Sequence, residues 1–569
     1  MNFRFKTIIF ITILISISFL NAQEALKSTE EEYYDFLSLQ GLVERPTLGY
    51  RTLSDSVWNV PEDTDHIWTS NNLGSTNILW KPAAPADNWF TNGIFQGLKY
   101  KIFGPEWFNS YNTAAPYGQN DGALWQGRGY NTALTTGLRL EGYGFELTFK
   151  PQVSFSQNLP FDIMDNSAYY TNKYAYIWGY SKDSGVDAPQ RFGDKAFWNY
   201  DWGDSEVRWG WKSFTLGFGT ESIWLGPAFL NPILHSNNAA SYPKFDIGLR
   251  KTKLTIPYLN YDLGYLEARM WLGKLSESEY FDTDDSNNHN QITGMSVYFS
   301  PSFLDGLVIG INKICLSKWD DDEYYKYLNP MYGMLGAKDG NVAEDQKVSL
   351  SAEWLAPKGG MDAFFELAID DHANTYDSID TYITHFWHAF VYTFGFKKQF
   401  DIKSEKKISG ELLFEWNNTE MSQDFQMHWP YNFGFHHKVT QGYTNKGQWL
   451  GSGIGYGGQS QYLGLKIYYP KGSSLIYLHR YNPDNNFLFK EAIYDVSTGE
   501  KGDLHKRTWN NYKGILAVGI NSNYFIFDSF SINGSLTYCR IVNSLYNQDI
   551  KLYPKLHNIM CSLELKYSF

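Results

Sequence analysis

The last eleven residues of the chain, 559–569, alternate strictly in their side chains. One phase is apolar and holds Ile559, Cys561, Leu563, Leu565, Tyr567 and Phe569. The other phase is polar apart from Met560. A period of two places these sets on opposite faces of a β-strand. An apolar face that ends on a carboxy-terminal aromatic residue is typical of the last strand of an outer-membrane β-barrel. An edge strand of a soluble sandwich is the alternative.

The amino-terminal residues have the pattern of an export signal. Arg4 and Lys6 precede an apolar run at 7–20, and Ala22 provides a small residue for cleavage. The run is too short to span a bilayer comfortably. We therefore predict that residues 1–22 are a signal peptide, with an uncleaved anchor as the alternative.

Composition narrows the class of an exported chain. Beyond residue 23 no apolar run approaches the ~18 residues of a spanning helix, and Phe, Tyr and Trp make up 18% of the chain. Barrels use aromatic residues at both membrane interfaces, and sugar-binding surfaces use them as well. The net charge of −13 argues against a nucleic-acid partner. The three cysteines have no metal-ligand spacing, and Cys539 and Cys561 should face opposite sides of the wall, without a disulfide.

Two kinds of segment follow the signal. Residues 28–40 predict a short helix, because Ser28 and Glu31 form a capping box and Gly41 follows. We interpret 23–95 as a periplasmic or plug-like segment, or else a separate small domain. Alternating strands such as 145–156, 362–370 and 408–416 then dominate, which predicts an all-β transmembrane barrel over 96–569. At about one strand per 25 residues, roughly 16 to 20 strands are expected, in an even number.

Residues 186–250 hold the most informative motifs. They include Arg-Phe-Gly-Asp at 191–194, Gly-Asp-Ser at 203–205, Trp-Leu-Gly-Pro at 224–227 and Ser-Asn-Asn-Ala at 236–239. Related stretches lie at 120–129 and 442–458. In this order the motifs resemble the Wzi-type capsule assembly family. The resemblance implies an outer-membrane barrel of 18 strands, monomeric and non-enzymatic, that acts as a lectin-like receptor for capsular polysaccharide.

The same motifs contain the side chains of a sugar site. Aromatic rings pack against sugar C–H faces, while amide and guanidinium groups bind hydroxyls or uronates. The candidate ligand-binding residues are Trp125, Arg128, Asn131, Trp224, Asn231, Asn237 and Asn238. Their alternative role is structural, because Asn caps turns and Arg fills barrel interiors as ion pairs. We expect Arg128, Asp194, Asp204 and the two adjacent asparagines to point into the barrel or its mouth. Arg191 and Arg208 are the expected partners of the two carboxylates.

Catalytic and metal motifs are weak. The sequence has no H-E-x-x-H, G-x-S-x-G or Walker motif, so we assign no catalytic residue, metal or cofactor. Residues 453–458 match a dinucleotide-binding pattern in letters only and predict a Gly-rich barrel turn or strand. The histidines at 385, 388, 428, 436 and 437 are expected in the aromatic girdles or the lumen, with metal binding as the alternative. The acidic run at 320–323 is expected in a solvated loop, with Ca²⁺ binding as the alternative.

Three functions remain open from the sequence. The favoured one is a non-enzymatic outer-membrane protein that binds capsular or other surface polysaccharide and aids capsule assembly. The alternatives are a diffusion porin with an open lumen and, less favoured, a barrel enzyme such as a lipase or protease. The expected partners are polysaccharide and outer-membrane lipid, with no nucleic acid.

Overall fold

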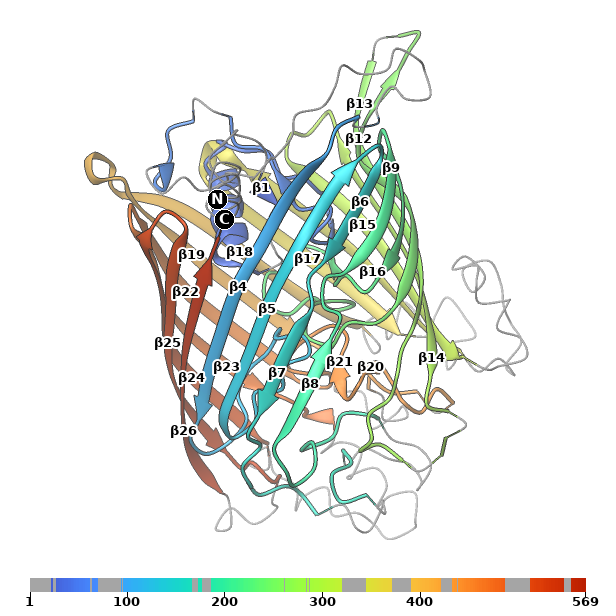
Figure 1. The fold of residues 1–569 in the computed structure, drawn as a ribbon, viewed down its shortest axis with the longest axis vertical. Coiled ribbons are helices and arrows are strands. Elements are labelled where there is room, and N and C mark those ends of the chain that lie inside the picture. Colours follow the sequence, from blue (N-terminus) through green and yellow to red (C-terminus); the bar gives the residue numbers. More distant parts are fainter. Residues whose placement is uncertain are drawn as a thin grey trace, which may run out of the picture.

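A closed antiparallel β-barrel encloses a folded amino-terminal segment and several inward loops in the computed structural model (Figure 1). The structure describes residues 22–23, 27–61, 64–69, 94, 96–165, 172–176, 186–259, 261–282, 284–285, 287–319, 344–370, 390–420, 432–436, 438–486, 512–546 and 554–568. No helix in these ranges is long and apolar enough to cross a membrane.

The barrel wall begins with β4 and closes where β26 pairs with it. In chain order its segments are β4 (Lys99–Asn112), β5 (Gly129–Gly142), β6 (Phe145–Phe149), β7 (Gln152–Ser156), β8 (Phe197–Asp201), β9 (Glu206–Trp211), β10 (Phe214–Gly219), β12 (Lys244–Ile256), β13 (Tyr261–Lys274), β14 (Asn290–Pro301), β15 (Leu307–Lys318), β16 (Glu344–Ala356), β17 (Met361–Asp370), β18 (Phe390–Lys403), β19 (Ile408–Asn418), β22 (Gln459–Tyr469), β23 (Gly472–Asn482), β24 (Gly514–Phe527), β25 (Phe530–Val542) and β26 (Lys555–Tyr567). Closure leaves no free sheet edge among these strands.

Two of the wall strands are interrupted. Both β6 and β7 pair with β5, so they are successive halves of one strand. The next strand is divided in the same way, since β8 pairs with β7 and β9 pairs with β6. Pro151, which has no backbone N–H to give to a ladder, stands at the first break. Counted this way, the described chain forms an 18-stranded barrel, as the sequence predicted.

The remaining elements are short. They are β1 (Ala22–Gln23), α2 (Thr29–Leu39), β2 (Tyr50–Arg51), β3 (Val57–Trp58), β11 (Trp224–Leu225), η3 (Pro357–Gly359), η4 (Ser404–Lys406), β20 (Thr444–Asn445) and β21 (Gln448–Trp449). The predicted helix is present, since the Ser28 side chain accepts the Glu31 N–H at 3.1 Å and Gly41 ends it with a φ of 71°. The pairs β1–β3, β11–β2 and β20–β21 form separate two-stranded sheets.

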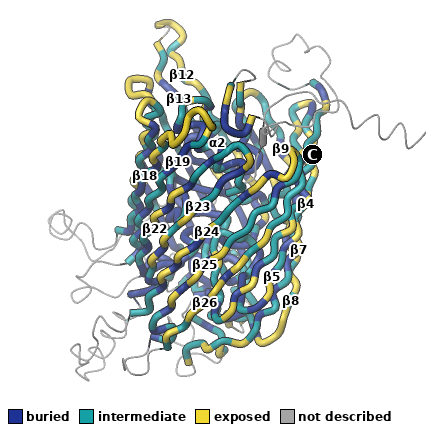
Figure 2. Tube along the Cα trace, turned by 90° about the vertical axis from the view of Figure 1, so that its left-hand side faces the viewer, coloured by how far each residue is buried: buried dark blue, intermediate teal, exposed yellow. Residues whose placement is uncertain are grey.

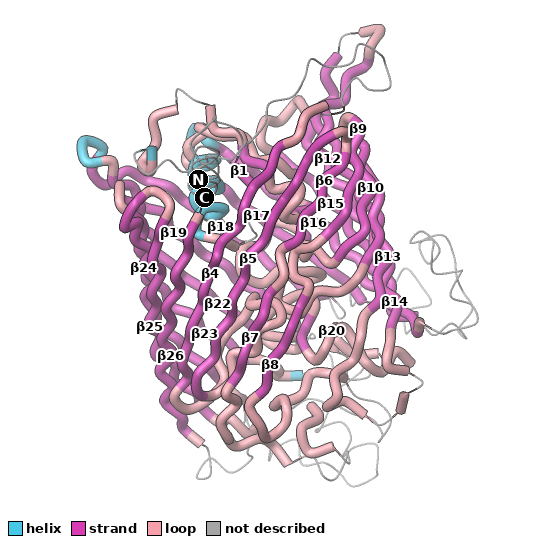
Figure 3. The backbone as a smooth tube through the Cα atoms, viewed as in Figure 1, coloured by secondary structure: helices cyan, strands magenta, loops and turns pink. Residues whose placement is uncertain are grey.

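The two ends of the barrel differ in their connections. Short turns join β5 to β6, β9 to β10, β22 to β23 and β24 to β25 at one end, where α2 also lies (Figures 1 and 3). The connections at the opposite end are long, as at 113–128, 220–243 and 419–458. Outer-membrane barrels have short periplasmic turns and long extracellular loops. The α2 end is therefore periplasmic.

Along many of the wall strands, buried residues alternate with more exposed ones (Figure 2). In β26, Ile559 and Leu563 are exposed on the outer face while Asn558 and Met560 are buried inside, which confirms the predicted phase. In β17, Asp362 and Glu366 face the interior, again as predicted. An apolar outer face and a polar lumen are what a membrane-embedded barrel requires. Phe569 itself lies outside the described residues.

Candidate functional site

Helix α2 is held inside the periplasmic end of the barrel by ion pairs to the wall. The Lys466 ammonium lies 2.6 Å from Glu32, and the Lys566 ammonium lies 2.7 Å from Glu30. Lys397 forms a third pair with Asp35. Aromatic rings of the helix also pack against the wall, since Phe36 stacks on Tyr468 of β22 at 4.2 Å between centroids. The helix is thus fixed to the wall both by charge and by ring packing.

The chain after α2 continues through the lumen and is anchored by carboxylates of the wall. Glu267 of β13 accepts the backbone N–H groups of Leu48 and Tyr50, each at 2.7 Å. Asp55 lies 2.6 Å from both Arg250 and Arg269. A buried carboxylate that accepts several N–H bonds satisfies backbone groups which would otherwise be unpaired. These contacts place residues 48–55 firmly against β12 and β13.

The loop at 220–243 folds inward and meets this segment. Trp224 and Leu225 of β11 pair with Arg51 and Tyr50 of β2. Further along, Glu415 of β19 accepts the N–H of Phe229 and Leu230 at 2.9 Å and that of Asn231 at 2.7 Å. The loop is therefore connected to both the amino-terminal segment and the far wall.

A third segment, 432–458, covers the loop from the extracellular side. The Tyr443 hydroxyl donates to the Leu234 carbonyl at 2.9 Å, and the Tyr456 hydroxyl donates to the Ile233 carbonyl at 2.6 Å. Both rings are buried in one cluster with Tyr50, Ile223 and wall residues such as Trp271. We call residues 27–60, 220–243 and 432–458 the lumen plug. It is a packed core inside the barrel.

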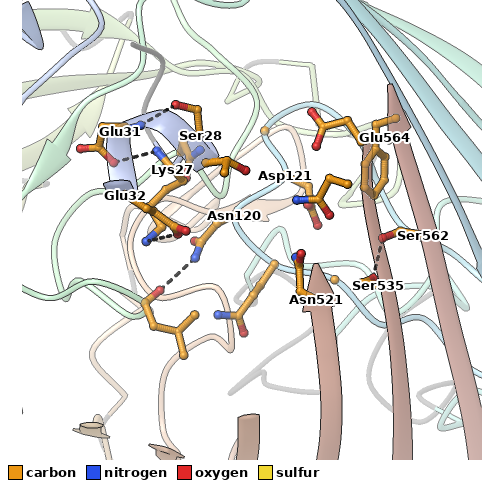
Figure 4. Close-up of a pocket in the computed structure, with 18 of the residues that line it drawn as sticks. Lys27, Ser28, Glu31, Glu32, Asn120, Asp121, Asn521, Ser535, Ser562 and Glu564 are labelled. Carbon is orange, nitrogen blue, oxygen red and sulfur yellow. Dashed lines mark hydrogen bonds and ion pairs between the residues drawn. The ribbon is translucent and has the colours of Figure 1, made fainter. Parts of the chain in front are cut away.

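The plug leaves a cavity of about 590 Å³ beside it. The cavity is bounded by α2, by the loop at 117–126 and by the inner faces of β23, β24, β25, β26 and β4 (Figure 4). Figure 4 shows Asn120 and Asp121 on the loop side, Glu31 and Glu32 on the helix side, and Asn521, Ser535 and Ser562 on the wall. Ligand sites in proteins commonly have volumes of about 300–1,000 Å³. This cavity is the candidate site.

Two ionisable groups of the loops have displaced pKa values. Burial raises the pKa of Asp121 at the cavity to about 7, although the Gln126 side-chain amide donates to it at 2.8 Å. Burial lowers the pKa of His235 in the plug to about 4. Its Nδ1–H donates to the Ile223 carbonyl, and its Nε2 accepts from the Tyr242 hydroxyl, each at 2.8 Å. Asp121 is thus partly protonated near neutral pH, while His235 stays neutral.

Trp224 and Asn231, two of the predicted site residues, lie inside the plug. The Trp224 side chain is fully buried, its indole N–H donates to the Ala228 carbonyl at 2.8 Å, and Lys27 and Arg51 lie over its ring. The Asn231 side chain is also fully buried and donates to Glu415 at 3.2 Å. Both side chains have their partners within the protein.

The two adjacent asparagines, Asn237 and Asn238, have different surroundings. Asn238 is buried, accepts the Asn120 N–H and donates to the Trp449 carbonyl, both at 3.0 Å. The neighbouring Asn237 lines the cavity. Of the seven predicted site residues, Asn237 is the one that borders this space.

The other predicted residues lie at the extracellular mouth. The Trp125 ring is 5.2 Å from that of Phe192. Arg128 donates to the carbonyls of Thr113 and Pro160, and Asn131 is buried with its amide bonded to the Gly127 carbonyl at 3.0 Å. These three contacts connect the loop at 113–128 to the loops that flank it.

One of the two predicted carboxylate pairings is wrong. Asp194 lies 3.0 Å from Arg191, as expected. Asp204, however, lies 3.8 Å from Lys150, while Arg208 pairs with Glu206 and Asp246 at 2.8 and 2.7 Å. The reason is the strand period, because residues 206 and 208 share the inward face of β9 while Asp204 precedes the strand.

Several functional residues were missed by sequence reasoning. The anchoring carboxylates Glu267 and Glu415 and the cavity residue Asn521 were not singled out. The sequence pattern that could have identified them is a polar residue in the inward phase of a wall strand. The histidines at 385, 388, 428 and 437 and the acidic run at 320–323 lie outside the described residues. His436 is described, and its ring nitrogen accepts the Val439 N–H at 3.1 Å.

Comparison with known proteins agrees with the resemblance seen in the sequence. Residues 142–317 match the model of the family described as capsule assembly protein Wzi. This range contains β6 to β14, all of β15 but its last residue, and the whole inward loop at 220–243. The predicted family resemblance is therefore confirmed over this part of the chain. No curated protein matches the sequence.

Among solved structures, the fold is similar to that of Wzi from Escherichia coli. That protein is described as an outer-membrane protein involved in Group 1 capsule assembly and as a carbohydrate-binding β-barrel. The match has a TM-score of 0.57 at 12% identity and covers 97% of this chain and 100% of the other. OccAB1 of Acinetobacter baumannii (TM-score 0.38, 9% identity, 83% and 97% covered) and OccK3 of Pseudomonas aeruginosa (0.38, 10%, 83% and 95%) also match.

Proposed function

We propose that this protein is an outer-membrane barrel that binds surface polysaccharide, including capsular polysaccharide, and aids capsule assembly without catalysing a reaction. The observation that carries the proposal is the family match over 142–317, because this range includes the inward loop that builds the plug. The fold it shares with the carbohydrate-binding Escherichia coli barrel supports the same function. The apolar outer face of the wall makes outer-membrane lipid its surroundings.

The plug argues against the diffusion porin. Helix α2, the segment at 48–55 and the loops at 220–243 and 432–458 pack against one another and the wall across the lumen. A porin needs a water-filled path. A barrel closed by a packed core suits a receptor that holds its ligand, and we propose that it acts as a monomer.

Two measurements test the proposal. Purified protein in detergent should retain the polysaccharide of its own bacterium on a binding surface, and deletion of the gene should lower cell-associated capsule. The proposal would be overturned if the purified protein does not retain the polysaccharide, or if deletion of the gene leaves cell-associated capsule unchanged. Planar bilayers discriminate the porin, because the plugged barrel should show no steady single-channel conductance.

A further inference from the structure

The inner wall is built differently on its two sides. Where the plug rests, the wall carries large side chains such as Arg269 and Trp271 of β13 and Tyr298 of β14. In β24 and β25, the inward positions that line the cavity are small or polar, namely Asn521, Asn523, Ser531, Asn533, Ser535 and Thr537. Small side chains leave space that the plug does not fill. The cavity therefore follows from the residues of the wall.

The cavity offers hydrogen-bonding groups that the protein itself does not use. Within the described part of the chain, the Asn521 and Asn533 side chains make no hydrogen bond. Five further lining amides each keep one buried polar atom without a partner among the described residues: Gln119 and Asn523 a nitrogen, and Asn120, Gln126 and Asn237 an oxygen. Unused donors and acceptors thus occur together. A sugar hydroxyl can both donate and accept, so it matches this mixture.

Charge at the cavity disfavours an acidic ligand. Ten carboxylates border it against six cationic side chains. The lysines of the wall strands already form ion pairs, since Lys466 pairs with Glu32, Lys566 with Glu30 and Lys397 with Asp35. A uronate or phosphate brought here would meet excess negative charge in a space partly shielded from water.

Aromatic rings supply apolar faces on one side of the cavity. The Tyr462 and Tyr477 rings stack at 5.6 Å between centroids, and Phe229 of the plug lies 5.8 Å from Tyr462. All three residues border the cavity. Rings beside amides and hydroxyls are the combination that binds the two kinds of sugar surface, C–H faces and hydroxyl groups.

We propose that this lumen cavity is a saccharide site that takes a short uncharged segment of the surface polysaccharide, with Asn237, Asn521 and Asn533 among its contacts. This inference rests on the proposed function, and it locates the polysaccharide-binding site in the cavity. The remaining predicted residues, Trp125, Arg128, Asn131, Trp224, Asn231 and Asn238, shape the plug and the mouth around that site.

The test uses the full-length purified protein and oligosaccharides from partial hydrolysis of the polysaccharide of its own bacterium, separated into neutral and acidic fractions. Calorimetric titration should show binding of the neutral fraction and much weaker binding of the acidic one. Asn521→Trp, which fills the cavity, should weaken neutral binding by about tenfold or more. Its matched control is Ile520→Trp, one residue away on the exposed outer face, which should bind as the wild type does.

Asn521→Ala covers the case in which the larger side chain prevents folding, which circular dichroism would reveal. This variant removes hydrogen-bonding groups without adding volume, and it should weaken binding severalfold. Wild-type affinity in Asn521→Ala, or in a folded Asn521→Trp, would overturn the cavity site. A preference of the wild type for the acidic fraction would overturn it as well. If the wild type holds whole polysaccharide but no oligosaccharide, this inference fails and the proposed function stands. If it holds neither, the proposed function fails.

Discussion

The backbone N–H of Asn231 donates a 2.7 Å hydrogen bond to Glu415, which lies 184 residues further along the chain. The same carboxylate accepts the N–H groups of Phe229 and Leu230, and it is fully buried in the lumen. One wall residue thus determines the position of the tip of the inward loop. Plug and barrel thus form a single folded unit. Mutations that release the plug should open the lumen and give measurable ion conductance in planar bilayers.

Substitution Glu415→Ala should loosen the loop at 220–243. Three backbone N–H groups, two of them buried, would lose their acceptor, and each buried group left unsatisfied costs about 1–3 kcal/mol. We expect a lower melting temperature in detergent and intermittent conductance in planar bilayers. Glu405→Ala, at an exposed periplasmic turn, is the control and should change neither. A Glu415→Ala variant as stable and as silent as wild type would contradict the anchoring role.

Trp224 should matter for stability far more than an exposed tryptophan of the wall. Its buried ring packs between β2 and the loop, beneath Lys27 and Arg51, and Trp→Ala in a core typically costs about 3–5 kcal/mol. Trp198, which is 70% exposed on the outer face, provides the comparison. We expect a large fall in melting temperature for Trp224→Ala and a small one for Trp198→Ala. Equal falls would show that the plug contributes little to stability.

Arg45 links the amino-terminal segment to the wall through three carboxylates. Its guanidinium lies 2.8 Å from Asp35, 2.6 Å from Glu353 and 2.7 Å from Asp362. Removing one member of a buried charge network leaves the others unpaired, at about 3–5 kcal/mol. Arg45→Ala should therefore destabilise the protein and raise proteolysis of residues 27–60. Lys407→Ala, which breaks only the exposed pair with Asp65, should cost about 1 kcal/mol or less; a similar loss in both variants would argue against this anchor.

The wall and the helix could be predicted from the sequence because both are local patterns. Period-two alternation identified the inward phase of β17 and β26, and Ser28 with Gly41 marked the helix. The plug could not be predicted in the same way. The residues at 224–238 combine rings and amides as a sugar site does, but their partners, such as Glu415 and Tyr50, are distant in the sequence. Only the closed barrel brings them together, and it shows most of these side chains to be part of the plug.

Stability should fall in mild acid through His235. The pKa of this buried ring is about 4 in the folded protein, below the usual 6.5, because burial disfavours the charged form. Between pH 6.5 and pH 4 the unfolded chain therefore binds more protons at this position, so stability is full above pH 6.5 and is lost as the pH falls. A shift of this size corresponds to about 3 kcal/mol.

Melting temperatures of wild type and His235→Gln, measured in detergent from pH 7 to pH 4, test this effect. Glutamine keeps a donor and an acceptor near the Ile223 carbonyl and the Tyr242 hydroxyl but does not titrate. The wild type should lose more stability than the variant across this range, with the difference confined to the interval below pH 6.5. Parallel curves would mean that acid acts through other groups, and a wild type that gains stability towards pH 4 would contradict a neutral, buried His235.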